Sequence, residues 1–192
     1  MAARPLVGIF VGGRGLRMGG VAKGLLPAPD GSGPLAKRLV RVTREAWSDA
    51  DVWLVGSAAA YSELGIPGLD DDPRGVGPLG GLAALLRHGV ETRAPAAYAL
   101  ACDLPFLSAS YLSKLAAFAP EAPAVAPRGN GIWQPLAARF RPGPALAATA
   151  DARAAGQRSL WCVLERLNAV ELVIEDAREL TDWDEPADVA GS

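Results

Sequence analysis

Short apolar runs alternate with segments of helical periodicity along most of the chain. Runs of this length, bounded by glycine, proline or acidic residues, predict strands that are buried on both faces, and they lie at 5–11, 51–56, 96–103, 122–128 and 169–175. Apolar residues at helical spacing predict helices at 34–47, 77–89, 108–118, 142–155 and 159–166. The alternation predicts the α/β class, with a mostly parallel, doubly wound sheet in three layers.

One pair of strands departs from the parallel pattern. The turn Gly129–Asn130–Gly131 leads from the fourth run into the segment IWQPLAARF. Glycine and asparagine accept the positive φ angles of tight hairpin turns, so this segment is predicted to be an antiparallel neighbour. In sheets of this class ligands bind beyond the carboxyl ends of the strands. The residues that follow each strand are therefore the candidates for a functional site.

Composition narrows the class of function. A chain of 192 residues fits a single domain, here 1–192, and its net charge of −2 provides no general field for nucleic acid or a membrane surface. No apolar stretch has the roughly 20 residues that a membrane-spanning helix needs, so we expect a cytoplasmic protein. Cys102 and Cys162 are too few for a disulfide framework, and one histidine, His88, leaves little for zinc sites or histidine-based catalysis.

The segment after the first run, GGRGLRMGGVAKG, contains the features of a phosphate-binding loop. A dinucleotide-binding fingerprint is excluded because Met18 stands where the third glycine is needed. A P-loop is excluded because Lys23 precedes a glycine and not a hydroxyl residue. What remains is a glycine-rich backbone that phosphate oxygens can approach, with Arg14, Arg17 and Lys23 to neutralise a triphosphate.

Three further motifs follow predicted strands or close the chain. Asp103, in Cys102–Pro105, is placed to hold a hard cation such as Mg²⁺, which completes its shell with water and substrate phosphates. Asp70, Asp71 and Asp72 precede the element Gly77–Gly81, where small residues permit close approach of a flat ligand or of the first loop. At the end of the chain, Asp182 or Asp184 could supply a second carboxylate to the same cation.

These four motifs together resemble the molybdenum cofactor guanylyltransferase family, over almost the whole chain. The residues on which this resemblance rests are Phe10, Val11, Gly12, Gly13, the run Arg17–Met18–Gly19–Gly20 with Lys23, Gly77–Gly81, and Cys102–Pro105. The resemblance implies a Rossmann-like nucleotidyltransferase fold that transfers GMP from GTP to the phosphate of molybdopterin and releases pyrophosphate. It also implies a nucleotide-binding half at about 1–105 and an acceptor-binding half at about 106–192, with molybdoenzyme-maturation proteins as further partners.

The resemblance also assigns roles to single residues. Arg17, Lys23 and Asp103 are expected to be catalytic, and Asp103 with Asp184 is expected to bind Mg²⁺. Nucleotide contacts are expected from Phe10, Val11, Gly12, Gly13, Lys23, Asp70, Asp72, Gly80 and Asp103. An anionic phosphate nucleophile needs charge neutralisation and alignment more than a general base, which suits a site without histidine.

Three positions depart from the family pattern. Ala22 stands where the family has an aspartate before the lysine, Gln134 stands for a histidine before proline, and Asp182–Pro186 replaces a motif built on asparagines. These departures leave two alternatives open. One is a related enzyme that uses CTP or another phosphorylated acceptor, and the other is a catalytically silent protein that binds nucleotide or cofactor.

Overall fold

The computed structural model describes residues 4–12, 22–73 and 75–183. Its main element is a seven-stranded sheet with the order β3-β2-β1-β4-β8-β5-β9. The strands are β1 Leu6–Phe10, β2 Asp51–Val55, β3 Gly68–Leu69, β4 Ala97–Ala101, β5 Ala124–Ala126, β8 Ala137–Phe140 and β9 Val170–Glu171. All neighbours are parallel except β8, which is antiparallel to both β4 and β5. A separate hairpin pairs β6 Arg128–Gly129 with β7 Ile132–Trp133.

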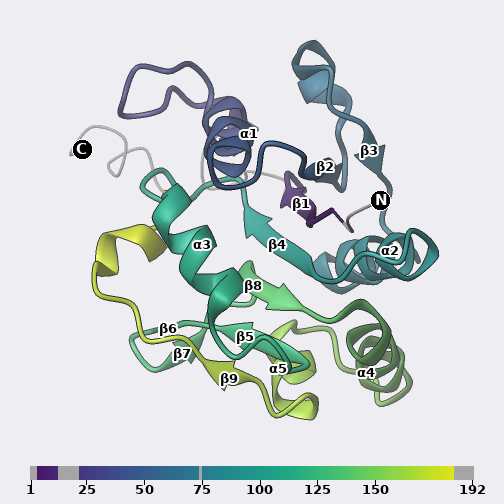
Figure 1. Ribbon diagram of the computed structural model, residues 1–192. Coiled ribbons are helices and arrows are strands. Elements are labelled where there is room, and N and C mark those ends of the chain that lie inside the picture. The colour runs from purple at the N-terminus through teal and green to yellow at the C-terminus, as the bar shows by residue number, and fades with distance from the viewer. Residues whose placement is uncertain (1–3, 13–21, 74, 184–192) are drawn as a thin grey trace.

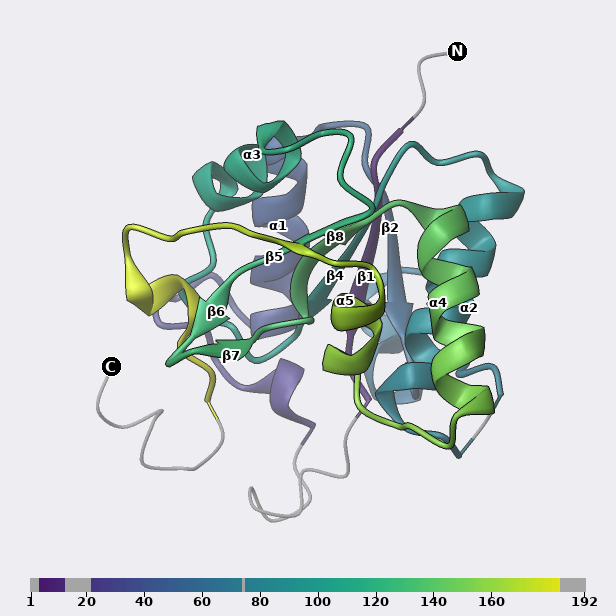
Figure 2. The ribbon, with the colours of Figure 1, turned by 90° about the horizontal axis from the view of Figure 1, so that it is seen from below.

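Helices cover both faces of the sheet, so the fold has three layers (Figure 1, Figure 2). The helices α1 Leu35–Ala46 and α3 Ala109–Ala117 pack together on one face. On the other face α2 Pro78–Glu91 packs against α4 Pro142–Ala154, which contacts α5 Trp161–Arg166. The described residues also form the 3-10 turns η2 Lys23–Leu25, η3 Ala59–Leu64 and η4 Ala177–Leu180. Within the described ranges, no helix combines the length and the apolar character that crossing a membrane requires.

The apolar runs form strands because the sheet is buried on both faces. All five residues of β1 are buried, and alternate residues of this strand belong to two different core clusters. Val7 and Ile9 pack toward α1 and α3, whereas Leu6 and Phe10 pack toward α2 and α4. A continuous apolar run is the sequence pattern of such a central parallel strand.

The register of the strands brings the functional segments to one edge. Phe10 pairs with Val55 of β2 and with Ala101 of β4, so these strands end at the same level. Gly12 and Asp103 follow directly, and the segment 70–72 follows β3 at the same edge. The antiparallel β8 begins at this edge, where Leu136 O accepts a hydrogen bond from Ala101 N at 2.7 Å.

The structure confirms the mixed α/β fold, and it shortens one predicted strand. The run at 169–175 forms a strand only at Val170–Glu171. Leu172 and Ile174 pack against the core as an extended segment, while Val173 is 81% exposed. An apolar run indicates that side chains are buried. It does not indicate whether a neighbouring strand continues beside it to form hydrogen bonds. The turn η3 and the short strand β3 were not predicted, because neither has a clear period.

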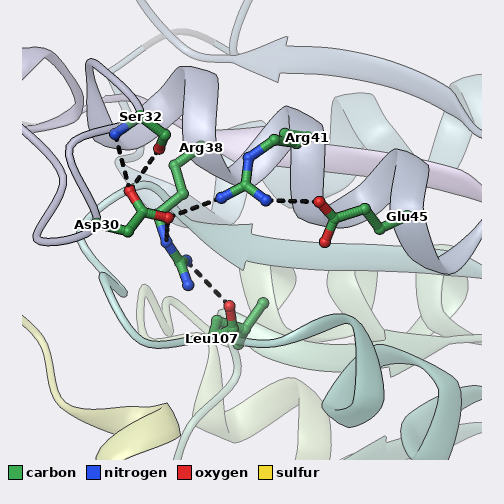
Figure 3. A network of polar contacts seen from close by, with 6 residues as sticks. All are labelled: Asp30, Ser32, Arg38, Arg41, Glu45 and Leu107. Carbon is green, nitrogen blue, oxygen red and sulfur yellow. Dashed lines mark hydrogen bonds and ion pairs between the residues drawn. The ribbon is translucent and has the colours of Figure 1, made fainter.

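A polar network joins the start of α1 to the loop that follows β4 (Figure 3). Asp30 accepts hydrogen bonds from Ser32 and ion-pairs with Arg38 and Arg41. The hydrogen bond from the Ser32 hydroxyl, more than the two guanidinium groups, holds the pKa of Asp30 below its usual value. Arg38 Nη1 also donates to the carbonyl of Leu107 at 3.0 Å. This network therefore ties α1 to the segment that carries Asp103.

Candidate active site

A cavity of about 290 Å³ lies at the carboxyl edge of the sheet. It lies at the ends of β1, β2 and β4, at the start of β8 and at the N-terminus of α2. Its lining residues are Phe10, Val11, Gly12, Lys23, Val55, Asp71, Gly77, Pro78, Ala101, Cys102, Asp103 and Leu136. Apolar walls with a few convergent charges are typical of small-molecule sites.

Two opposite charges meet in this cavity. Lys23 begins the turn η2, and Asp103 lies two residues beyond β4. The Nζ atom of Lys23 donates to Oδ2 of Asp103 at 2.9 Å. The side chains are only 20% and 18% exposed, so the pair is largely screened from water while both groups still face the cavity. Both residues were selected from the sequence, and the fold brings them into direct contact.

Of the acidic triplet, Asp71 is the residue that lies at the cavity. Asp71 lines the cavity, whereas Asp70 and Asp72 are absent from its lining. Asp72 instead forms an ion pair with Arg87 of α2. Desolvation, followed by the negative charge of Asp70, raises the pKa of Asp71 above its usual value. A carboxylate kept partly from water at a cavity wall is costly unless a ligand's donors satisfy it.

The glycines of α2 have a packing role. A Cβ at Gly80 would lie 2.5 Å from the carbonyl oxygen of Pro73, and Gly80 O accepts a hydrogen bond from Asp72 N. A Cβ at Gly81 would lie 2.7 Å from Val55 Cγ1 and 3.1 Å from Asp71 Oδ1. Gly80 is buried and does not line the cavity, although it was predicted as a nucleotide contact. The segment that approaches these glycines is 71–73, and α2 thereby fixes the position of Asp71.

The thiol at the cavity wall has little nucleophilic character. Burial, more than the nearby Asp103 carboxylate, raises the pKa of Cys102 to about 12. Neighbouring Tyr61 is also buried, and desolvation raises its pKa to about 12. Cys102 and Cys162 are both free and buried, as expected from the sequence. The ionisable groups that remain for chemistry in the described part of the cavity are Lys23, Asp71 and Asp103.

The end of the described chain reaches Asp103. Trp183 N donates to the carbonyl oxygen of Asp103 at 3.0 Å, and the indole ring is 2% exposed. The sequence marked the motif around Trp183 for its carboxylates and assigned the indole no role. Asp184 was predicted as a second metal ligand and lies outside the described residues, as do Gly13 and Arg17.

The donor set is compatible with a hard divalent cation. Asp103 and Asp71 offer carboxylate oxygens to one cavity, and Mg²⁺ prefers such ligands. Among the described residues no group of three or more His, Cys, Asp or Glu could form a complete cage. A cation that keeps several waters and binds substrate phosphates does not require such a cage.

Two of the positions that depart from the family pattern are described in the structure. Ala22 packs its methyl group against the core cluster beside α1, and its carbonyl accepts from Leu25 N at 2.8 Å. An apolar side chain thus holds the start of η2. Gln134 lies at the base of the β6–β7 hairpin, where its backbone N donates to Pro127 O at 3.0 Å. On this hairpin the guanidinium of Arg128 stacks 4.0 Å from the centre of the Trp133 ring.

Comparison with known proteins identifies similar chains. A family model described as the MobA-like NTP transferase domain matches residues 7–170. The molybdenum cofactor guanylyltransferase of Pseudomonas putida is 33% identical over 186 residues, which cover 93% of this chain and 92% of the relative. A probable molybdenum cofactor guanylyltransferase of Mycobacterium tuberculosis (strain ATCC 25618 / H37Rv) is 29% identical over 181 residues, covering 93% and 88%.

Solved structures agree with this fold. Molybdopterin-guanine dinucleotide biosynthesis protein A from Archaeoglobus fulgidus superposes with a TM-score of 0.74 at 23% identity, covering 97% of this chain and 95% of that one. The 2-C-methyl-D-erythritol 4-phosphate cytidylyltransferase from Thermus thermophilus gives 0.67 at 18% identity, covering 99% and 96%. At these identities the likeness is one of fold.

Proposed function

Because the chain belongs to the MobA-like NTP transferase family and is a nucleotidyltransferase, we propose that it transfers GMP from GTP to the phosphate of molybdopterin. The products are pyrophosphate and the guanine dinucleotide form of the molybdenum cofactor. The observation that carries the proposal is the joint presence of Lys23 and Asp103 in the cavity at the carboxyl edge of the sheet. Together they offer a cationic group for phosphate and a carboxylate for a divalent cation, the two kinds of group that metal-dependent phosphoryl transfer uses.

The reaction is a displacement at the α-phosphorus of GTP. An oxygen of the molybdopterin phosphate attacks this phosphorus, the bond to the bridging oxygen of the β-phosphate breaks, and pyrophosphate leaves with the electron pair. The nucleophile is already an anion, so the site has to align two anions and offset their charge. Lys23 is placed to bind the triphosphate, and Arg17 is a further candidate from the sequence.

Asp71 is the proposed contact for the guanine base. One carboxylate can accept two parallel hydrogen bonds, from the ring N–H and from the exocyclic amine of guanine. The corresponding edge of cytosine offers a single amine donor beside acceptor atoms. The raised pKa of Asp71 reflects poor hydration of its charge, which two donors from a base would correct. Phe10, Val11 and Gly12 line the same cavity.

A Mg²⁺ ion is part of this proposal. Asp103 would hold it, and Asp182 or Asp184 is the candidate from the sequence for a second ligand. When bound there, the ion would supply positive charge that offsets the charge developing on the leaving group. Lys23 would then exchange its bond to Asp103 for bonds to phosphate oxygens.

The acceptor is proposed to approach from the second half of the chain, about 106–192. Leu136 brings the start of β8 to the cavity, and the β6–β7 hairpin precedes it directly. Arg128, stacked on Trp133, offers a positive charge on this hairpin. Proteins of molybdoenzyme maturation would receive the product.

Pyrophosphate release provides the test. The protein is incubated with Mg²⁺ and each of the four NTPs, with and without molybdopterin, and released pyrophosphate is measured. Pyrophosphate release that requires both GTP and molybdopterin, and that no other NTP supports, is the expected result. Release with CTP would identify a cytidylyltransferase, and tight GTP binding without release would identify a silent nucleotide-binding protein.

A further inference from the structure

Trp183, the last described residue, contacts the loop that carries Asp103. We propose that Trp183 is a positioning residue that fixes both Asp103 and the turn carrying Lys23, a proposal that rests on the function proposed above. The one side chain and its backbone N–H contact three segments that are distant in sequence: the loop after β4, the segment after η2, and the start of α1.

The first contact restrains the backbone of Asp103. Trp183 N donates to Asp103 O at 3.0 Å, so the peptide that follows the carboxylate has a defined orientation. The Trp183 ring also meets the edge of Phe106, with centroids 6.4 Å apart and an interplanar angle of 89°. This T-shaped contact is a favoured aromatic geometry, and it holds the same loop three residues further on.

The second contact reaches the chain that follows Lys23. Trp183 forms a small core cluster with Ala28 and Leu35, and Leu26 packs against it. Leu26 is the C-terminal cap of η2, and its N–H donates to Lys23 O at 3.0 Å. The indole therefore lies between the segment that carries Lys23 and the loop that carries Asp103. Its position determines how these two segments are spaced.

Other contacts support the same loop from both sides. Ser108, which caps α3 through Tyr111 N, hydrogen-bonds to Glu179 of η4. Arg38 donates to Leu107 O at 3.0 Å from the network of Figure 3. The C-terminal segment thus holds the loop 103–108 at its beginning through Trp183 and at its end through Glu179. In Figures 1 and 2 this yellow segment runs beside α3.

Loss of the Trp183 ring is expected to weaken binding at the site in addition to lowering the stability of the fold. When the supporting contacts of a metal ligand are lost, metal affinity or activity falls by roughly 10–100-fold. Trp183→Leu keeps the backbone N–H and removes the ring, so it tests the packing contribution. Trp183→Phe keeps an aromatic ring, and it is the conservative rescue variant.

Phe140→Leu is the matched control. Phe140 is fully buried in β8, but it pairs with Ala97 at the end of β4 opposite to Asp103. This variant removes a buried aromatic ring at the end of β4 that lies away from the cavity. Each variant is measured at the same number of degrees below its own melting temperature. A loss of global stability is thereby separated from a loss of positioning.

The experiment measures GTP binding by calorimetry as a function of Mg²⁺, and amide hydrogen exchange of residues 23–28 and 102–108 without nucleotide. We expect Trp183→Leu to weaken Mg²⁺-dependent GTP binding by about tenfold and to raise exchange in both segments. Trp183→Phe should recover most of the binding, and Phe140→Leu should leave both readouts as in the unmodified protein.

Two results would overturn the inference: unchanged exchange in 23–28 and 102–108 in Trp183→Leu, or an equal effect of Phe140→Leu. Failure of the proposed function has a different signature, because the unmodified protein would then release no pyrophosphate from GTP and molybdopterin. Hydrogen exchange decides on Trp183 in either case, since it requires neither substrate. If Trp183→Leu does not fold, Phe106→Leu, which removes the ring partner of Trp183 in the T-shaped contact, takes its place and should raise exchange in 102–108. Unchanged exchange in that variant would likewise overturn the inference.

Discussion

Lys23 Nζ lies 2.9 Å from Asp103 Oδ2, although the two residues are 80 positions apart in the sequence. The pair joins the glycine-rich loop to the end of the central strand β4. Each charge compensates the other inside a largely apolar cavity, which lowers the cost of keeping both there. In the proposed reaction, substrate phosphates and the cation would replace this contact, and substitution of each residue tests its own role.

Asp103→Asn should abolish Mg²⁺-dependent pyrophosphate release. The amide retains the size of the side chain but loses the charge that a hard cation requires. The fold should remain intact, because asparagine can still accept a hydrogen bond from Lys23 and both side chains of the pair retain about a fifth of their exposure. Circular dichroism and a melting curve check the fold, and Asp151→Asn on exposed α4 is the control. Turnover at the level of that control would remove Asp103 from the mechanism.

Lys23→Ala should mainly weaken the use of nucleotide. A hydrogen bond to a charged group is worth about 1.5–3 kcal/mol, which corresponds to a loss of roughly 10–150-fold in GTP affinity. Equilibrium binding of GTP in Mg²⁺ measures it, and Lys37→Ala on the exposed side of α1 is the control. Equal affinities in the two variants would contradict a phosphate-binding role.

Asp71→Asn should stabilise the protein and impair GTP binding. Desolvation raises the pKa of Asp71 above 3.8, so the folded protein holds this proton more tightly than the unfolded chain does. The free energy of unfolding therefore falls as pH rises from 3.8 through the raised pKa of the folded protein, and it stays lower at neutral pH.

The asparagine variant lacks this penalty, and its melting temperature at pH 7 should exceed that of the unmodified protein. The difference should shrink as pH falls through the raised pKa toward 3.8. GTP affinity of the unmodified protein should decline over the same window, because a protonated carboxyl no longer accepts two hydrogen bonds. A stability gain that does not change with pH would show that the carboxylate is not its source.

Gly80→Ala should destabilise the fold and reduce activity together. The new methyl group would lie 2.5 Å from Pro73 O, a backbone atom that cannot rotate away. Overpacking of this kind costs about 1–3 kcal/mol, and here it would also displace the segment that holds Asp71. Gly143→Ala in α4 is the matched control, since its Cβ meets no described atom within 4 Å. Urea denaturation and GTP binding measure the two effects.

The Cys102 thiol should resist alkylation in the native protein. Burial raises its pKa to about 12, so almost no thiolate exists at pH 8, and iodoacetamide reacts with the thiolate. Mass spectrometry should find labelling only after denaturation. Cys102→Ala should retain turnover within a fewfold, because the proposed chemistry does not use the thiol. Rapid native labelling at Cys102 would contradict this account of the cavity wall.

Much of the fold follows from local patterns in the sequence. Continuous apolar runs mark β1, β2 and β4, because these strands are covered on both faces, and Ser108 marks the start of α3 by capping it. The edge of the sheet is less predictable. Val170–Glu171 ends early since strand length there depends on the neighbour β5, which is itself only three residues long.

The site is predictable where a motif is tied to a strand end. Phe10, Val11, Gly12, Lys23 and Asp103 line the cavity, as the sequence suggested. The choice among Asp70, Asp71 and Asp72 depends on the turn before α2, and an unbroken acidic run does not encode it. Leu136 reaches the cavity only through tertiary packing, and near Trp183 the sequence marked the neighbouring carboxylates but not the indole.

The reversed direction of β8 has a consequence for where this chain can tolerate change. β8 starts at the cavity while its neighbours end there, so the chain between β5 and β8 leaves and re-enters the sheet at the catalytic edge. Residues 127–136 can lengthen, shorten or change sequence without altering the register of the strands that carry Gly12 and Asp103. The proposed nucleotide contacts and the proposed acceptor surface therefore occupy separate stretches of chain, and a substitution in one stretch need not disturb the other.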